Sequence, residues 1–389
     1  MEPVSHNVSG FYIHLPFCQH ICPFCSFAVL RDREDKREWY LSYLEKELDL
    51  LVHTFRFDFQ NVKSVYFGGG TPSRFRADQL NRIVEGIVSR FGPNSETQWS
   101  IEVNPEDITR SYAESLRHIG FNRVSIGIQS FDNDSLKTLG RIHSAAQGHR
   151  AVELLQNAGF HNINLDLLFG YPGQLRNDFQ KDVDQFVRHA PTHLSVYCLG
   201  IEPKTKINRL NTWRQWQVRN ENLISTMYRF AIHYLKKYRI NQYEISNFAK
   251  SGHQSVQNMI HWNGENYLGI GLGAHSYIDS VRWGNERRWL EYKHNIDLNR
   301  LPHAFSETLR ESEKRNEWLM IQLRLTEGVD IERYFDIFGV DLFKICDREI
   351  RSLLKTKHIE TAHNRLSLTP KGMLLADEIT VRLSGRLPD

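Results

Sequence analysis

Apolar positions along the first half of the chain follow two alternating periods. Short runs of β-branched, aliphatic and aromatic residues predict buried strands, and between them apolar residues recur every three or four positions, which predicts amphipathic helices. Strand and helix alternate about six times, at intervals of roughly 30 to 40 residues, and this pattern is typical of a parallel sheet or βα barrel. The predicted strands are Phe11–Leu15, Val62–Phe67, Trp99–Val103, Arg123–Gln129, Ile163–Phe169 and His193–Cys198.

Six βα units rather than eight would leave a barrel incomplete, with its side open to a large substrate. We therefore predict an α/β fold: an incomplete (βα)6 TIM-like barrel over residues 1–240, with an extension over 241–300. From about Phe305 onward the pattern is mostly helical, with one short alternating run at Arg365–Thr369. Residues 301–389 thus predict a small, winged-helix-like C-terminal domain. Its mixed basic and acidic residues favour structural packing over DNA binding.

Three of the five cysteines, Cys18, Cys22 and Cys25, lie within eight residues on a loop after the first strand. A closed zinc site takes four ligands, and ordinary cubane clusters take four thiolates. Three soft ligands instead indicate an iron–sulfur cluster with one iron open to a substrate or cofactor. The alternatives are a zinc site completed by His14 or His20 and three buried free thiols.

Polar residues also gather where later strands end. The turn Gly68–Pro72 follows the second strand, and its glycines would let backbone N–H groups approach a ligand; a tight structural turn is the alternative. Glu102 and Glu106 flank the next strand end, and Glu106 also suits a helix N-terminus. Asp166 lies inside an apolar strand, where an unpaired carboxylate is costly. Because parallel strands end at one edge, these groups predict a site there.

Composition narrows the classes of function. The net charge of +3 over 389 residues gives no excess of positive charge that would indicate binding to nucleic acid or a membrane surface. No apolar run approaches the ~20 residues of a membrane span. The first residues have neither the basic start nor the apolar core of a signal peptide. We expect a cytoplasmic protein whose cysteines are reduced.

The stretch Cys18-x3-Cys22-x2-Cys25 resembles the signature of the radical S-adenosylmethionine (SAM) superfamily. The resemblance implies a 4Fe-4S cluster whose open iron binds the amino and carboxylate groups of SAM. An electron passed through such a cluster releases a 5′-deoxyadenosyl radical. Gly68–Pro72 is similar to the superfamily's GGE-like motif, which holds the methionine amino group.

The order of motifs along the barrel resembles the oxygen-independent coproporphyrinogen III oxidase family, and the tail more weakly resembles that family's C-terminal domain. The family contains HemN, a dehydrogenase, and HemW, a heme chaperone. The resemblance implies that four residues contact cluster-bound SAM: Tyr12, Phe24, Gly69 and Glu102. Five further residues match positions that in HemN hold a second SAM or its surroundings: Gly70, Thr71, Gln129, Arg141 and Asp166.

Two features favour the chaperone branch. HemN-like sequences carry a further cysteine at the position of Phe27, and their N-terminal extension is missing before Phe11. The resemblance then implies a protein that binds heme, passes it to acceptor proteins of unknown identity and lacks coproporphyrinogen dehydrogenase activity. Peripheral membrane contact would arise only through acceptors. The alternatives are the oxidase itself, which decarboxylates porphyrinogen propionates, and a zinc-stabilised binding module without redox chemistry.

The heme-binding motif of the chaperone branch, His-Asn-x-x-Tyr-Trp, is altered in this chain. The matching stretch runs from Gln257 to Trp262 and has Gln in place of the motif histidine and His261 in place of its tyrosine. His261 and His253 are the candidate heme ligands, since imidazole is a common axial ligand; ordinary surface histidines are the alternative. The glycine-rich run Gly269–His275 lacks the βαβ frame of a dinucleotide site and predicts close packing.

Overall fold

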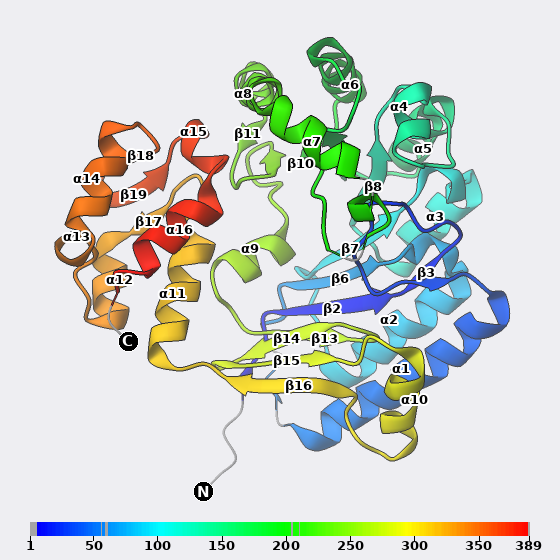
Figure 1. The fold of residues 1–389 in the computed structure, drawn as a ribbon. Helices are drawn as coiled ribbons and strands as arrows, with labels where there is room; N and C mark the ends of the chain where they lie inside the picture. The colour runs from blue at the N-terminus through cyan, green and yellow to red at the C-terminus, as the bar shows by residue number, and fades with distance from the viewer. Residues whose placement is uncertain (1–5, 56, 59–60, 204, 210, 388–389) are drawn as a thin grey trace, which may run out of the picture.

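The computed structural model describes residues 6–55, 57–58, 61–203, 205–209 and 211–387. Part of the expectation of a cytoplasmic location rests on residues 1–5, which lie outside this range. Within the described residues, a twelve-stranded sheet has the order β11-β12-β10-β9-β8-β7-β6-β2-β13-β14-β15-β16 (Figure 1). None of the described helices combines the length and apolar character needed to span a bilayer.

Six neighbouring strands of this sheet run parallel from β2 to β10, with one shift in register between β8 and β9. This arrangement confirms the predicted incomplete six-unit barrel. The strands are β2 (Gly10–Leu15), β6 (Ser64–Gly69), β7 (Gln98–Val103), β8 (Arg123–Gln129), β9 (Asn162–Phe169) and β10 (His193–Cys198).

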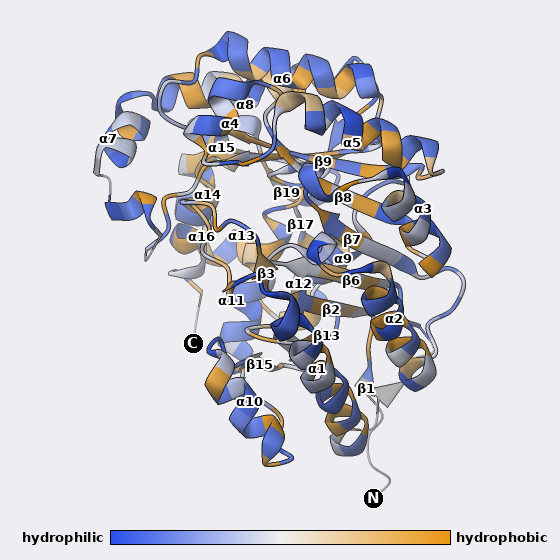
Figure 2. Ribbon diagram, turned by 90° about the vertical axis from the view of Figure 1, so that its right-hand side faces the viewer, coloured by the Kyte–Doolittle hydropathy of each residue, from blue (hydrophilic) through white to orange (hydrophobic). Residues whose placement is uncertain are grey.

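Helices cover the outer face of the parallel strands (Figure 1). Helix α2, for example, buries a stripe that contains Leu80, Ile83 and Ile87, and Figure 2 shows hydrophilic and hydrophobic residues alternating along α5 and α6. The helices are α1 (Glu34–Thr54), α2 (Ala77–Phe91), α3 (Arg110–Ile119), α4 (Asn133–Thr138), α5 (Ala145–Asn157), α6 (Arg176–His189), α7 (Asn211–Arg219) and α8 (Glu221–Lys236). Short 3₁₀ turns occur at Pro72–Arg74, Pro105–Asp107 and Ile207–Arg209.

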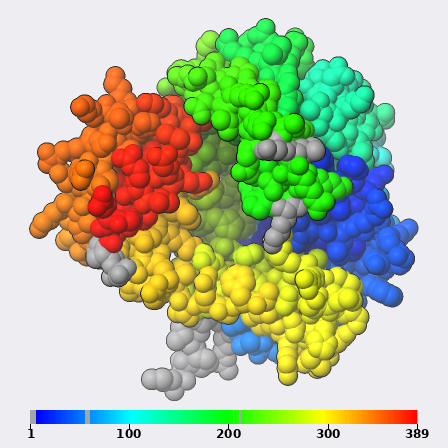
Figure 3. Space-filling view, viewed as in Figure 1, coloured from blue at the N-terminus to red at the C-terminus, as the bar shows by residue number. Residues whose placement is uncertain are grey.

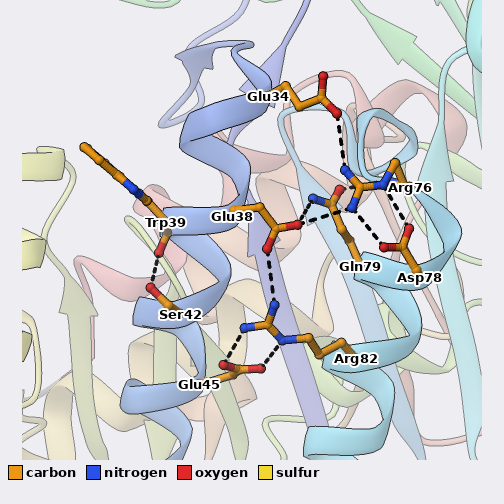
Figure 4. Close-up of polar contacts among 9 residues, drawn as sticks. All are labelled: Glu34, Glu38, Trp39, Ser42, Glu45, Arg76, Asp78, Gln79 and Arg82. Carbon is orange, nitrogen blue, oxygen red and sulfur yellow. Dashed lines mark hydrogen bonds and ion pairs between the residues drawn. The ribbon is translucent and has the colours of Figure 1, made fainter.

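Helices α1 and α2 are also joined at their solvent side by charged residues (Figure 4). Arg82 pairs with Glu45 at 2.6 Å between Nε and Oε1, and it also contacts Glu38 at 3.2 Å. Arg76 contacts Glu38 as well, at 3.4 Å. These pairs are half-exposed, so water screens them and each contributes little to stability. The apolar contact beneath them holds the two helices together.

The second part of the sheet is antiparallel. After β13 (Tyr267–Ile270), which pairs in parallel with β2, the chain forms β14 (His275–Ile278), β15 (Val281–Asn285) and the edge strand β16 (His303–Thr308). Helix α10 (Trp289–Asp297) lies between the last two strands. The expectation of helix from about Phe305 was wrong at its start, because β16 is an exposed edge strand whose polar residues carry no alternating apolar signal. β16 is part of the large sheet, although it falls within residues 301–389, the range predicted for the C-terminal domain.

At the opposite edge, the chain forms two short antiparallel strands, β11 (Asn241–Gln242) and β12 (Asn247–Ala249). Helix α9 (Val256–Trp262) follows. The short pairs β1 (His6–Asn7) with β5 (Phe57–Asp58) and β3 (Phe17–Cys18) with β4 (Leu30–Arg31) complete this part of the chain.

The C-terminal domain is small and mostly helical around a three-stranded sheet of order β17-β19-β18, as predicted. Cys346 is buried within it, as expected of an inert core thiol. The space-filling view shows a hollow between this domain, orange to red, and the green segments (Figure 3). Its elements are α11 (Glu311–Gln322), β17 (Val329–Asp330), α12 (Ile331–Phe338), α13 (Leu342–Ile345), α14 (Asp347–Lys355), β18 (Ile359–Ala362), β19 (Arg365–Leu368), α15 (Pro370–Met373) and α16 (Ala376–Ser384).

Candidate functional site

The cysteines lie on a loop whose two ends are fixed by the backbone. Strand β3 leaves the end of β2 and pairs with β4; the Leu30 N–H donates to the Pro16 carbonyl at 2.7 Å, and the Asp32 N–H donates to the Cys18 carbonyl at 2.9 Å. Between these anchors the Cys25 N–H donates to the Cys22 carbonyl at 3.1 Å, which closes a turn. We call residues 18–27 the cysteine loop. All three cysteines are free thiols.

The three thiols face one cavity of about 380 Å³ at the carboxyl ends of the parallel strands. Cys18 Sγ accepts from Thr71 Oγ1 at 3.4 Å, and Cys22 Sγ accepts from Arg141 Nη1 at 3.4 Å. Burial raises the pKa of Cys18 to about 11. Among the described residues no three Cys, His, Asp or Glu groups converge on a single ion. Three thiols that line one cavity suit a cluster whose irons each take one thiolate.

The cavity, which we call the first cavity, also collects the motif residues from successive strand ends. Tyr12 is the exception among the predicted SAM contacts, because it lies on the other side of the cysteine loop, and its contact with SAM stays a prediction. The predicted residues that line the first cavity are Cys18, Cys22, Phe24, Cys25, Gly69, Gly70, Thr71, Glu102, Gln129, Arg141 and Asp166.

Glu102 holds the glycine turn at the end of β6. Its carboxylate accepts from Tyr66 Oη at 2.9 Å and from the Gly69 N–H at 3.1 Å. Burial, reinforced by nearby Asp166, raises the pKa of Glu102 to about 7. Gly69 has a φ of 112°, and a Cβ there would lie 2.5 Å from the His14 ring. The glycines therefore serve close packing against β2 while the same turn lines the cavity.

Arg141 links the cysteine loop to two strand ends. Its Nη2 donates to Asn104 Oδ1 at 2.8 Å and to the Gly127 carbonyl at 3.1 Å, while Nη1 contacts Cys22. Asn104 was not among the predicted site residues; a polar residue beside a strand-end proline was the available signal. Glu106 faces His143 at 3.5 Å and does not line the first cavity.

Asp166 and Gln129 form the far wall of the first cavity. Asp166 accepts from Asn164 Nδ2 at 2.7 Å and from Ser125 Oγ at 3.3 Å, and burial raises its pKa against these hydrogen bonds. The carboxylate thus has partners on the protein side and still lines the cavity. Gln129 has a φ of 66°, at a break in register between β8 and β9. A non-glycine residue in this region is strained, and such strain clusters at ligand sites.

A second cavity of about 360 Å³ lies on the other side of the cysteine loop, between it and strands β13 and β14. Ser26 and Phe27 line both cavities. The second cavity holds His261, one of the two candidate heme ligands, whereas His253 lines neither cavity. Its full lining is Tyr12, His14, Ser26, Phe27, Ala28, His261, Tyr267, Gly273, Ala274, His275 and Arg287.

His261 stands at the C-terminal end of α9. Burial lowers its pKa to about 4, so the ring is neutral at pH 7, and this is the form that binds iron once Nε2 gives up the hydrogen bond that it accepts from Gln257. Nε2 contacts Gln257 Nε2 at 3.1 Å, and the ring meets Tyr267 edge-on with centroids 4.2 Å apart. Gln257, at the position of the motif histidine, is buried beside this ring rather than facing the cavity.

The glycine-rich run Gly269–His275 packs tightly, as expected: a Cβ on Gly269 would collide with the His275 backbone, and one on Gly271 with Tyr40 Oη. Cys198, the last residue of β10, is exposed. His275 and Arg287 line the second cavity and were missed as site residues, because they lie in hairpin segments without a strand-end motif.

Comparison with known families and proteins agrees with this geometry. Residues 12–186 match the family model described as the radical SAM superfamily, and residues 309–375 match the HemN C-terminal domain.

Curated relatives match nearly the whole chain. The heme chaperone HemW of Bacillus subtilis is 32% identical over 381 residues, which cover 97% of this chain and 99% of the relative. HemW of Lactococcus lactis is 30% identical and covers 95% of each chain. The solved structure of the coproporphyrinogen III oxidase HemN from Escherichia coli has a TM-score of 0.83 at 21% identity, with 98% of this chain and 91% of that chain covered, and this likeness shows the fold.

Proposed function

Because the chain belongs to the HemN/HemW family of the radical SAM superfamily, we propose that it is a heme chaperone that binds a 4Fe-4S cluster and SAM and transfers heme to acceptor proteins. The observation that carries the proposal is the pair of cavities on the two sides of the cysteine loop. One gathers the cysteines and the SAM motif residues, and the other holds a neutral imidazole at His261.

In the first cavity, Cys18, Cys22 and Cys25 would hold the cluster through their thiolates. The cluster, when bound, supplies an open iron for SAM and a centre for electron transfer. The Glu102 carboxylate and the glycine turn that it holds offer acceptors and backbone for the methionine amino group. Asp166, with its protein-side hydrogen bonds already made, presents a carboxylate edge to a polar ligand.

In the second cavity, His261 is proposed as the axial heme ligand. It takes over from the motif histidine, whose position is occupied by buried Gln257. His253 is the other candidate; it lies in the turn before α9, where the His253 N–H donates to the Lys250 carbonyl. Its test is included below because a half-buried imidazole can also bind iron.

The second candidate function is the oxygen-independent coproporphyrinogen III oxidase. Gln129, Arg141 and Asp166, which match the surroundings of a second SAM in HemN, line one cavity with the cysteines, and this favours it. Phe27, which stands where HemN-like chains have a cysteine, favours the chaperone. A decisive assay is anaerobic incubation of the cluster-loaded protein with SAM and coproporphyrinogen III; protoporphyrinogen formation would overturn the chaperone proposal.

Cluster binding is tested by anaerobic reconstitution followed by iron, sulfide and zinc analysis. We expect a brown protein with equal iron and sulfide whose visible absorbance bleaches on reduction. One zinc per chain without iron would instead support the zinc-stabilised module.

The heme ligand is tested by titrating hemin into cluster-loaded wild type, His261→Ala and His253→Ala, with exposed His53→Ala as the control. We expect the Soret band of His261→Ala alone to shift and weaken. A Soret band that is unchanged in both candidate variants would reject both ligands.

A further inference from the structure

The second cavity contains a positive charge that no carboxylate neutralises within the described part of the chain. Arg287 is exposed at its rim, and its one hydrogen bond runs from Nη2 to the Ser26 carbonyl at 2.9 Å. The neighbouring Arg288 differs, since it pairs with Glu291 at 3.4 Å and does not line the cavity. The remaining N–H groups of Arg287 are therefore available to an anionic ligand.

The cavity also offers flat apolar walls beside this charge. Phe27 is 66% exposed, although aromatic side chains of this size are usually buried, and Tyr267 lies across from the cysteine loop on β13. His14 cannot serve a ligand, because its Nε2 bonds the Ala28 carbonyl at 2.7 Å and its Nδ1 bonds Tyr12 Oη at 3.2 Å. His275, in contrast, has no ring hydrogen bond to any described residue and packs only against Phe305.

An exposed aromatic face, the His275 imidazole and the Arg287 guanidinium, which has no carboxylate partner among the described residues, fit a planar apolar ligand with a carboxylate at its edge. Arginine is suited to this task because its planar fork can bind a carboxylate with two parallel hydrogen bonds. We propose that Arg287 binds a propionate of the porphyrin, so that the propionate edge of heme lies in the second cavity against the cysteine loop. The inference rests on the proposed heme-chaperone function and adds its specificity-determining residue.

This placement brings the ligand next to the first cavity. Arg287 already holds the Ser26 carbonyl, and Ser26 follows the predicted cluster ligand Cys25 in the chain. A propionate bound by the other N–H groups of Arg287 would therefore lie close to Ser26, the residue that follows Cys25. SAM also carries a carboxylate, so the experiment must distinguish a heme propionate from the SAM carboxylate as the group that Arg287 binds.

The test compares hemin with hemin whose propionates are methyl esters, titrated by Soret absorbance into the cluster-loaded full chain. Wild type should bind hemin about tenfold more tightly than the ester, the usual scale of one charge-assisted pair. Arg287→Gln should reduce this preference to within about threefold. Arg288→Gln, which removes an equal charge one residue away, should keep the wild-type preference. Arg287→Lys should restore part of it, because the charge remains without the fork.

SAM affinity, measured on the same proteins, should be unchanged by Arg287→Gln; a parallel loss of SAM binding would assign Arg287 to SAM instead. If Arg287→Gln keeps the full preference for hemin over the ester, the inference is wrong while the chaperone function stands. If wild type binds neither porphyrin, the proposed function itself fails.

Discussion

The parallel and antiparallel parts of the large sheet share one local arrangement. In each part, a buried carboxylate accepts from the N–H of a glycine at a strand end: Glu102 from Gly69 at 3.1 Å, and Glu47 from Gly271 at 2.9 Å. Burial raises the pKa of each carboxylate to about 7. The difference lies in what else they face, since Glu102 lines the first cavity and Glu47 lines neither.

Glu47 is enclosed by the antiparallel part of the sheet. Besides Gly271, it accepts from Tyr292 Oη at 2.5 Å and Asn285 Nδ2 at 2.6 Å, and it is 1% exposed. It thereby fastens α1 to the hairpin that walls the second cavity. The same pairing therefore leaves a carboxylate at a cavity wall in the parallel half and encloses one completely in the antiparallel half.

The largest expected difference between the two cavities follows from removing one cysteine thiol. Cys22→Ala should abolish cluster binding and, with it, SAM binding, because SAM is expected on the open iron. Hemin affinity should stay within roughly threefold of wild type, since His261 and Arg287 come from outside the cysteine loop. The measurements are iron content, SAM binding and Soret titration.

Cys198→Ala is the matched control, because this thiol is exposed and outside both cavities. It should retain full iron. Loss of hemin binding in Cys22→Ala would show that the cavities are one functional unit.

The parallel half could be predicted from the sequence because its chemistry follows the fold's repeat. Each predicted strand ended near a polar residue, and parallel topology alone requires that these ends lie at one edge of the sheet. Glu102, Gln129 and Asp166 do line one cavity at that edge. The antiparallel half could not, since hairpin contacts depend on pairing partners that no local pattern specifies. Arg287 reaches its cavity only through the pairing of β14 and β15, and polar β16 gave no strand signal.

The structural role of Glu47 was not predicted from the sequence. It lies between Leu44 and Leu48 on the apolar stripe of α1, where a charged residue contradicts the helical pattern. That contradiction was a readable sign of a buried, fully bonded carboxylate. Its partners, in contrast, lie more than two hundred residues away along the chain, and only the folded sheet identifies them.

The second prediction concerns Glu47 and pH. Its pKa is about 7 in the folded protein and 4.5 in the unfolded chain. A raised carboxyl pKa contributes stability that is fully present below pH 4.5 and is lost as pH rises to about 7. The 2.5-unit difference is worth about 3 kcal/mol. Denaturant unfolding at a series of pH values should show this fall in the free energy of unfolding.

Glu47→Gln resembles the protonated acid and should remove that part of the pH slope. A variant whose free energy of unfolding follows the wild-type pH profile would show that Glu47 ionises normally. Glu45→Gln, at a half-buried position on the same helix, is the control and should change the profile little.

The third prediction is the corresponding change in the first cavity. Glu102→Gln keeps the shape but replaces one accepting oxygen with a donor, which opposes Tyr66 Oη or the Gly69 N–H. Losing a charged hydrogen-bond acceptor costs about 1.5–3 kcal/mol, so SAM affinity of the cluster-loaded protein should fall roughly ten- to a hundredfold. Glu106→Gln, outside the cavity, should leave SAM affinity unchanged. Neither substitution should change hemin affinity. A lower hemin affinity in Glu102→Gln would show that the two cavities are energetically coupled.

The smallest expected effect tests the residue that the two cavities share. Phe27→Ala should not alter stability by more than about 0.5 kcal/mol, because the side chain is 66% exposed. If its ring stacks on the porphyrin, the loss of an aromatic contact of about 1 kcal/mol should weaken hemin binding roughly three- to tenfold. SAM affinity should change less than hemin affinity, because the first cavity retains Phe24 as an aromatic wall. The reverse ranking, with SAM binding the more affected, would assign Phe27 to the first cavity and leave the second without its exposed aromatic face. Phe27→Leu separates stacking from simple apolar contact, since only stacking requires the ring.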